Sequence, residues 1–183
     1  MRILILDGQA DAGSEVYVSY IADLKSALAS HGNDVQIISL RDKKIKSCTG
    51  CWGCWVKTPG LCVTNDYTHD VRHAYINSDF VLLSSPVIMG FTSALLKMTQ
   101  DKLIPLVHPY ITLVNNECHH EPRYPKYPML GLLLDRNGDA DDEDISIISD
   151  IQSRFALNLK SELRFTLTMD QPVKEVFDAI NAI

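Results

Sequence analysis

The sequence reads Arg2-Ile3-Leu4-Ile5-Leu6-Asp7-Gly8 directly after Met1, an apolar run that ends in a turn signal. A strand that is buried on both faces of a sheet has this pattern, because neither face alternates with polar residues. The pattern therefore predicts a buried first strand with a ligand-facing turn after it. Similar short runs recur along the chain, at Val35–Leu40, Phe80–Ser84, Leu130–Leu134 and Leu163–Thr168.

Helical patterns separate these runs. Apolar residues recur at helical spacing, and the expected helices are 14–30, 67–77, 92–103, 140–159 and one that starts at Pro172. Strand–helix alternation of this kind predicts an α/β fold, a doubly wound parallel sheet of five strands with helices on both faces. We expect one domain over 1–183, with a cysteine-rich loop at 41–66 and an insertion at 105–128 that holds a β-like run, Tyr110–Val114.

The bulk composition narrows the class of protein. The chain has 183 residues, 46% of them hydrophobic and 22% charged, which is typical of a soluble globular protein. Its net charge of −6 argues against nucleic acid as a general partner. No stretch approaches the about 18 apolar residues of a membrane span. We therefore expect a cytoplasmic protein without nucleic acid or membrane partners.

Four of the five cysteines fall between Cys48 and Cys62, where the chain reads Cys-Thr-Gly-Cys-Trp-Gly-Cys-Trp-Val-Lys-Thr-Pro-Gly-Leu-Cys. Iron–sulfur clusters take four thiolates, and bacterial cluster loops begin with cysteines at the same close spacing. Four thiolates also form zinc sites, although those sites usually pair two separated arms. Reduced thiols without a ligand are the third interpretation. The spacing favours redox chemistry.

Ligands of open α/β sheets bind beyond the carboxyl ends of the strands. The loops to consider are therefore Gly8 to Ser14, Arg41 to Asp66, Ser85 to Phe91 and Arg136 to Asp139. The cysteine run lies in the second of them. A separate group, Glu117, His119 and His120, is interpreted as a metal site, a proton-donating patch or a set of surface residues, because adjacent histidines usually point in different directions.

Two motifs resemble a known family. Ser85-Pro-Val-Ile-Met-Gly90-Phe-Thr-Ser-Ala-Leu-Leu-Lys97 resembles the Ser-Pro-x-Tyr-x-Gly-x-x-Ser-x-x-Leu-Lys loop of the flavodoxin-like, NADPH-dependent FMN reductases, with Ile88 in place of tyrosine. The cysteine run is similar to the motif that ligates a [4Fe–4S] cluster in the iron–sulfur flavoprotein branch of that family. The resemblance implies a flavodoxin-like strand order, 2-1-3-4-5.

The resemblance also implies an FMN-dependent oxidoreductase. Its cofactor-binding residues would be Gly8, Ser14, Ser85, Pro86, Val87, Met89, Gly90 and Phe91, and its cluster ligands Cys48, Cys51, Cys54 and Cys62. The implied electron donor is NAD(P)H or reduced ferredoxin, and the acceptor is a small molecule or a protein. Members of the family usually form homodimers or homotetramers, for which the 105–128 insertion is the contact candidate.

The first loop departs from the family pattern. The family usually has Gly-Ser-Pro-Arg there, whereas this chain has Gly8-Gln-Ala-Asp11-Ala-Gly-Ser14-Glu15, with two acids and no arginine. A helix N-terminus at Ser14 favours phosphate, and the acids oppose it. Two alternatives therefore stay open: a flavin-only NAD(P)H-dependent FMN or quinone reductase, and a zinc-loop module that binds a partner without flavin.

Overall fold

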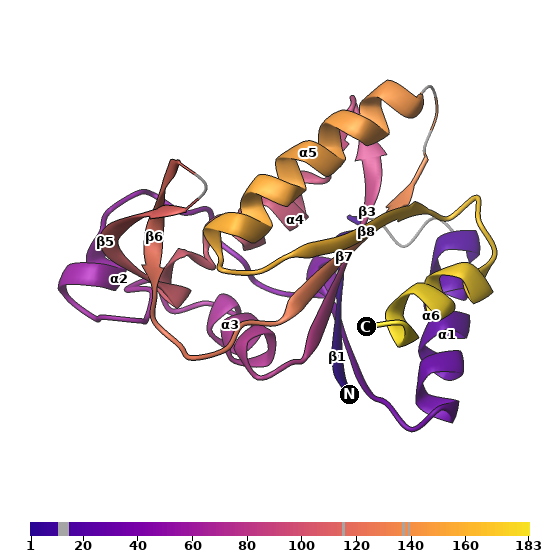
Figure 1. Ribbon diagram of the computed structural model, residues 1–183, viewed down its shortest axis with the longest axis horizontal. Helices are drawn as coiled ribbons and strands as arrows, with labels where there is room; N and C mark the ends of the chain where they lie inside the picture. The colour runs from indigo at the N-terminus through magenta and orange to yellow at the C-terminus, as the bar shows by residue number, and fades with distance from the viewer. Residues whose placement is uncertain (11–14, 115, 137, 139) are drawn as a thin grey trace.

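The computed structural model describes residues 1–10, 15–114, 116–136, 138 and 140–183. Its main sheet contains five parallel strands in the order β2-β1-β3-β7-β8, which confirms the predicted 2-1-3-4-5 arrangement (Figure 1). A sixth strand, which the sequence reading missed, pairs antiparallel with β3. The strands are β1 Arg2–Asp7, β2 Asp34–Ser39, β3 Phe80–Ile88, β4 Phe91–Thr92, β7 Met129–Asp135 and β8 Leu163–Thr168.

Helices cover both faces of this sheet. Helices α1 and α6 lie together on one face, and α3, α4 and α5 lie on the other (Figure 1). Their bounds are α1 Glu15–Ser30, α3 Thr68–Ile76, α4 Ala94–Asp101, α5 Asp142–Asn158 and α6 Val173–Asn181. Three short elements complete this side of the fold: η1 Leu40–Asp42, α2 Gly53–Val56 and η2 Ile104–Leu106.

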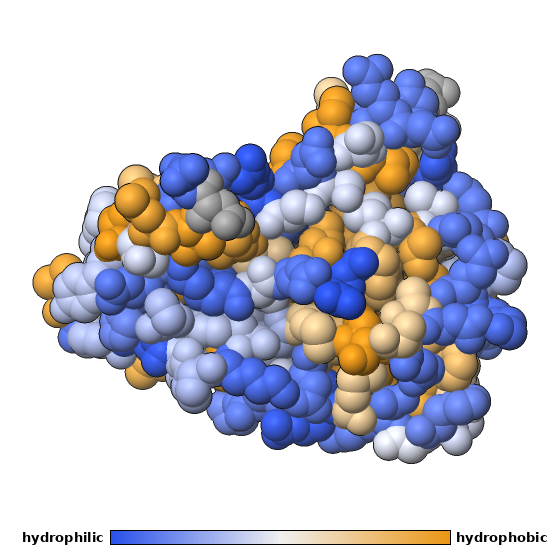
Figure 2. All heavy atoms as spheres, in the orientation of Figure 1, coloured by the Kyte–Doolittle hydropathy of each residue, from blue (hydrophilic) through white to orange (hydrophobic). Residues whose placement is uncertain are grey.

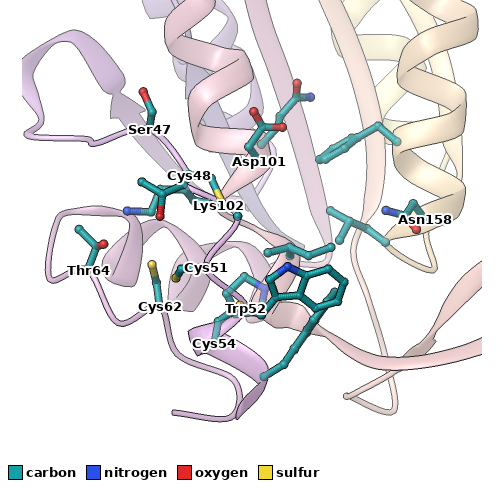
Figure 3. A pocket seen from close by; sticks show the side chains of 18 residues that line it. Ser47, Cys48, Cys51, Trp52, Cys54, Cys62, Thr64, Asp101, Lys102 and Asn158 are labelled. Carbon is teal, nitrogen blue, oxygen red and sulfur yellow. The ribbon is translucent and has the colours of Figure 1, made fainter. Parts of the chain in front are cut away.

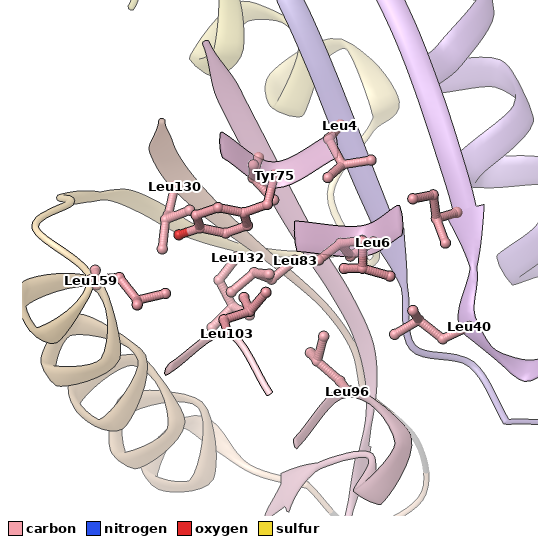
Figure 4. Close-up of a cluster of buried hydrophobic side chains, with 14 of the residues drawn as sticks. Leu4, Leu6, Leu40, Tyr75, Leu83, Leu96, Leu103, Leu130, Leu132 and Leu159 are labelled. Atoms are coloured by element: carbon pink, nitrogen blue, oxygen red, sulfur yellow. The ribbon is translucent and has the colours of Figure 1, made fainter. Parts of the chain in front are cut away.

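The two helix layers bury alternate residues of the same strands. Ile3 and Ile5 pack under α1 and α6, whereas Leu4 and Leu6 pack under α3, α4 and α5 (Figure 4). All four side chains are at most 1% exposed. Successive side chains of a strand point to opposite faces, so a strand that is covered on both sides must be apolar throughout. The continuous apolar run near the N-terminus is the direct consequence.

The segment 105–128 contains a β-hairpin that stands outside the main sheet. Strands β5 Val107–Val114 and β6 Glu117–Pro122 pair antiparallel as a separate two-stranded sheet. The β-like run Tyr110–Val114 lies within β5, and the sequence did not predict its partner. Apolar side chains gather over this hairpin, where Tyr110, Ile111 and Leu113 are exposed (Figure 2).

Strand β3 is longer than predicted. The sequence reading ended the strand at Ser84 and assigned Ser85 to Phe91 to a loop, but β3 continues through Ile88. A turn of Met89 and Gly90, with φ of 51° and 72°, then reverses the chain into β4. Positive φ at both residues of a two-residue hairpin is the type I′ turn, which matches the twist of the flanking strands.

Within the described ranges, no helix combines the length and apolar character that a membrane span requires.

Candidate functional site

Gly8 follows β1 directly and lies in close contact with its surroundings. Its backbone N–H donates to the Ser84 carbonyl at 2.8 Å. A Cβ at this position would lie 2.9 Å from the Leu96 Cβ, 3.0 Å from the Ser84 carbonyl oxygen and 3.0 Å from the Ser93 hydroxyl. Glycine is therefore required here by packing, because any side chain would collide with the backbone of β3 and with the first turn of α4.

Ser93 joins the two segments that the sequence proposed as flavin-binding. Its backbone N–H donates to the Ser85 hydroxyl at 2.8 Å, and its own hydroxyl donates to the Gly8 carbonyl at 2.6 Å. The same hydroxyl accepts from the Leu96 N–H and caps α4. All of these groups are buried. The sequence reading quoted Ser93 within its motif but gave it no role, although a serine directly before a helical run is a typical N-cap signal.

The turn of β3 into β4 faces solvent. Met89 is fully exposed, Ile88 is 44% exposed and Phe91 is partly buried. A Cβ at Gly90 would lie 2.7 Å from a carboxylate oxygen of Asp144, so the turn packs against the first turn of α5. This places an apolar, backbone-exposing turn at the carboxyl end of the central strand. Ser14, the other predicted cofactor residue, lies outside the described residues.

Asp7 connects the carboxyl ends of β1 and β2. This buried carboxylate accepts from the Gln9 N–H at 3.0 Å, the Ser39 hydroxyl at 2.9 Å and Nη1 of Arg41 at 3.0 Å. The contact brings a guanidinium to the start of the first loop, which has no arginine of its own. Sequence reasoning missed Arg41 because it lies 34 residues from Asp7, and the parallel pairing of Asp7 with Ser39 brings the two together.

Cys48, Cys51, Cys54 and Cys62 line one cavity of about 490 Å³ (Figure 3). The other side of the cavity is formed by residues at the ends of α4 and α5, among them Lys102 and Leu159. Neither Gly8 nor any residue of the Ser85 to Phe91 segment lines it. We call Gly8 and the Ser85 to Phe91 segment, at the carboxyl ends of β1 and β3, the strand-edge residues. Within one copy of the chain, they and the cysteine cavity are separate parts of the molecule.

The backbone of the cysteine loop turns sharply around the cavity. Gly50 has φ of 64°, Trp52 61° and Gly60 87°. A Cβ at Gly53 would lie 2.5 Å from a Val63 methyl group and 3.5 Å from the Cys51 sulfur. The glycine between two of the cysteines therefore leaves room for the returning chain at Val63, one residue after Cys62.

The thiols interact electrostatically. The Gly53 backbone N–H lowers the pKa of the exposed Cys51 thiol, because it stabilises the thiolate. Burial raises the pKa of Cys54, and the negative charges of Cys62, Cys48 and Cys51 raise it further. The set has the donor chemistry of a cluster or zinc site. Among the described residues, however, no three His, Cys, Asp or Glu side chains are arranged to hold a metal ion, so coordination requires the thiols to turn inward.

Asp66 anchors both ends of the cysteine loop. Its carboxylate accepts from the Lys46 N–H at 3.0 Å and from the Thr68 N–H at 3.0 Å, and it pairs with the Lys102 ammonium. The Asp66 and Lys102 side chains are 0% and 1% exposed. Burial alone raises the pKa of Asp66, but the hydrogen bonds from Lys102 and Thr68 outweigh it, and the pKa lies well below its usual range.

His119 and His120 of the hairpin lie in different surroundings, and His119 is buried rather than at the surface. His119 is paired with Glu117, its Nε2 3.2 Å from a carboxylate oxygen, and Glu117 also pairs with Arg154 of α5. The His120 ring lies instead on Trp55, with centroids 4.8 Å apart. Trp55 in turn donates from Nε1 to the Val107 carbonyl at 3.0 Å. The histidines therefore serve packing and pairing, and they attach the hairpin to the cysteine loop.

Comparison with known proteins identifies the family. The sequence profile of the NADPH-dependent FMN reductases matches residues 1–115. The chain belongs to this family. The predicted class of enzyme, a flavin-dependent oxidoreductase, is that of the family. Over 86 residues the chain is 35% identical to an iron–sulfur flavoprotein of Methanocaldococcus jannaschii, a match that covers 47% of this chain and 44% of that protein.

A second relative supports the resemblance to the iron–sulfur flavoprotein branch. The chain is 35% identical over 81 residues to an iron–sulfur flavoprotein of Archaeoglobus fulgidus, which covers 44% of this chain and 36% of that protein. The chain therefore matches less than half the length of each of these curated relatives. The expected resemblance to the branch is confirmed at the level of sequence.

Solved structures confirm the fold. A putative quinone reductase from Klebsiella pneumoniae superposes with a TM-score of 0.68 at 13% identity, covering 100% of this chain and 83% of that one. An FMN-dependent NADH-azoreductase from Bacillus anthracis, in complex with FMN, gives 0.68 at 12% identity and covers 99% and 98%. At these identities, the agreement concerns the flavodoxin-like fold of this chain.

Proposed function

We propose that this FMN reductase is an electron-transfer oxidoreductase that binds FMN at the strand edge and a [4Fe–4S] cluster in the cysteine cavity. The observation that carries the proposal is the gathering of Cys48, Cys51, Cys54 and Cys62 around one cavity. Four thiolates are the ligand set of such clusters. The fifth cysteine, Cys118, is exposed on the hairpin and does not line the cavity.

For FMN, the proposed residues are Gly8, Ser14, Ser85, Pro86, Val87, Met89, Gly90 and Phe91. Support comes from the Ser93 hydrogen bonds, which hold the start of the first loop against β3. Exposed Ile88 and Met89 offer an apolar edge to a flavin ring. Arg41 lies at the start of the first loop, where its guanidinium is paired with Asp7.

When bound, FMN supplies two-electron hydride chemistry and the cluster supplies one-electron transfer. The residues of this chain bind and orient these groups. Trp52 and Trp55 line the cysteine cavity and reduce the access of water to it. The family supports NADPH as electron donor, and reduced ferredoxin is the alternative. We propose a small molecule or a protein as acceptor.

We also propose that the active form is a homodimer or homotetramer. The support is the hairpin in the 105–128 segment, where Tyr110, Ile111 and Leu113 are 64%, 56% and 71% exposed. Apolar side chains that are clustered and exposed in this way favour contact with another protein surface. Sedimentation equilibrium of the wild type and of Leu113→Asp tests the proposal, since a contact through the hairpin is weakened by the charge.

The cofactor proposal is tested by the visible spectrum of anaerobically purified protein, together with iron, sulfide, zinc and flavin analysis. FMN with iron and sulfide is the expected result. Protein that contains neither iron nor sulfide after anaerobic reconstitution would contradict the cluster. Zinc without flavin would instead support a zinc-loop module.

A flavin-only reductase is the second candidate. The observation in its favour is that the thiols, in the conformation described, are not arranged to hold a metal. This candidate predicts flavin without stoichiometric metal, and NADPH oxidation that is unchanged in a Cys54→Ser variant.

A further inference from the structure

Arg72 is a buried cation that the proposed chemistry has not used. It lies on α3, and the whole residue is 3% exposed. Its Nη1 donates to the Thr68 hydroxyl at 3.2 Å and to the Lys102 carbonyl at 3.4 Å. Its Nη2 is buried without a hydrogen-bond partner among the described residues. A buried guanidinium nitrogen without an acceptor is costly, and a bound ion or water is one of the partners that such a group takes in native proteins.

The charge of Arg72 is also uncompensated. The neighbouring buried cation, Lys102, is paired with Asp66. Arg72 forms no ion pair within the part of the chain that the structure describes. Together these three side chains leave one net positive charge beneath the cysteine loop. Buried charges are normally paired, so this position is suited to an anion that the protein itself does not supply.

The cysteine loop is the neighbour that can supply it. His69, one turn earlier on the same face of α3, has its Nε2 3.1 Å from the Cys62 carbonyl oxygen. Lys102, whose carbonyl Arg72 contacts, lines the cysteine cavity. Burial lowers the pKa of Arg72, and the negative charges of Cys62, Asp66 and Cys54, in that order, oppose the effect. These contacts place the guanidinium within electrostatic reach of two of the four sulfurs.

We propose that Arg72 is the buried positive partner of the anionic group that the four cysteines hold, and that it raises both the affinity for that group and its reduction potential. This assignment rests on the proposed function. Four thiolates outweigh the charge of a zinc ion or of a [4Fe–4S] core, so either group is negative as a whole. One-electron reduction makes a cluster more negative, and a fixed positive charge nearby therefore favours the reduced form.

The first test uses zinc alone as the probe. Metal-free, reduced protein is titrated with Zn²⁺ in competition with a chromophoric chelator, for the wild type, Arg72→Gln and Arg72→Lys. We expect the Gln variant to bind Zn²⁺ about tenfold more weakly than the wild type, a typical loss when a residue that supports metal ligands is replaced. The affinity of the Lys variant should lie between those of the wild type and the Gln variant. Arg154→Gln is the matched control, because it removes the same charge from an exposed site outside the cavity.

The second test measures potential rather than activity. Protein reconstituted anaerobically with iron and sulfide is titrated with dithionite, and the cluster is followed by its visible absorbance and EPR signal. We expect a lower reduction potential in Arg72→Gln than in the wild type, and no change in Arg154→Gln. A residue that only supported the fold would change the unfolding temperature without this shift. If Arg72→Gln does not fold, Arg72→Lys is compared with the wild type instead. The Lys variant is then expected to bind Zn²⁺ more weakly than the wild type.

The outcomes separate this assignment from the function on which it rests. Wild-type protein that takes up neither zinc nor iron would overturn both the cluster and the role of Arg72. Wild-type protein that takes up metal, with Arg72→Gln and Arg72→Lys equal to it in affinity and potential, would overturn the role of Arg72 alone.

Discussion

The strand-edge residues and the cysteine cavity differ in how many of their polar groups are hydrogen-bonded within the protein. At the strand edge, the hydroxyls of Ser85 and Ser93 are hydrogen-bonded to the protein, and Gly8 has no room for a side chain. Around the cysteine cavity the Asp66 contacts hold the loop, but its cysteines form no disulfide, and the Nη2 of nearby Arg72 has no hydrogen-bond partner among the described residues. The first region is closed by contacts within the fold, whereas the second leaves polar groups available to a ligand.

The largest expected effect concerns the Asp66–Lys102 ion pair, which holds the ends of the cysteine loop. Asp66→Asn leaves the Lys102 ammonium buried without a carboxylate, and breaking such a pair costs about 3–5 kcal/mol of the free energy of unfolding. Urea unfolding at pH 7 measures the loss. If the variant is as stable as the wild type, the Asp66–Lys102 pair does not stabilise the folded protein.

The pH dependence of the same pair sharpens this result. The pKa of Asp66 is depressed in the folded protein, so its contribution is complete above the ordinary aspartate pKa of about 3.9 and is lost as the pH falls below it. The difference in unfolding free energy between the wild type and Asp66→Asn should therefore shrink below about pH 4. A constant difference down to pH 2.5 would contradict the assigned pairing.

The next effect tests the close packing of the strand edge. In Gly8→Ala the new methyl group meets the Leu96 Cβ and the Ser84 carbonyl, and overpacking of this kind costs about 1–3 kcal/mol. Gly53→Ala is the counterpart in the cysteine loop, where the methyl group meets the end of the exposed Val63 side chain. We expect Gly8→Ala to lower the thermal unfolding temperature, and Gly53→Ala mainly to lower metal uptake. Equal unfolding temperatures for the two variants would remove the contrast between the regions.

A smaller effect is expected at Ser93. Ser93→Ala removes the N-cap of α4 and the hydrogen bond to the Gly8 carbonyl, and the loss should be about 1–2 kcal/mol. Chemical unfolding measures it, and FMN affinity measured by fluorescence quenching should fall in parallel. Ser26→Ala, at an exposed site on α1, is the control, with little change in either quantity.

The smallest effect on stability is expected at the cysteines themselves. Cys54→Ser should leave the free energy of unfolding of the metal-free protein within about 0.5 kcal/mol of the wild type, because the Cys54 thiol forms no disulfide and serine is close to it in size. Metal binding should be lost while FMN is retained. Cys118→Ser is the matched control and should keep both. Unchanged iron content in Cys54→Ser would show that the ligand set is wrong.

The sequence was most informative where a local pattern dictates the structure. The runs at Arg2–Leu6 and Leu130–Leu134 lie in strands that are covered on both faces of the sheet, and their apolar residues record this directly. It was less informative at Ser85 to Phe91, where a strand and a type I′ turn replace the predicted loop. Met89 carries no turn signal, and the pairing of β3 with β4 determines its conformation instead.

Local patterns were sufficient to identify the individual strands, their alternation with helices and the four-cysteine set, because each of these is read from residues that are near one another in sequence. The roles of Arg41, Ser93 and Arg72 came only from the folded chain. Arg41 reaches Asp7 because β1 and β2 are parallel neighbours, and Arg72 reaches the end of α4 because α3 and α4 pack on one face. Such contacts follow from burial of the whole sheet, a property that no single segment encodes.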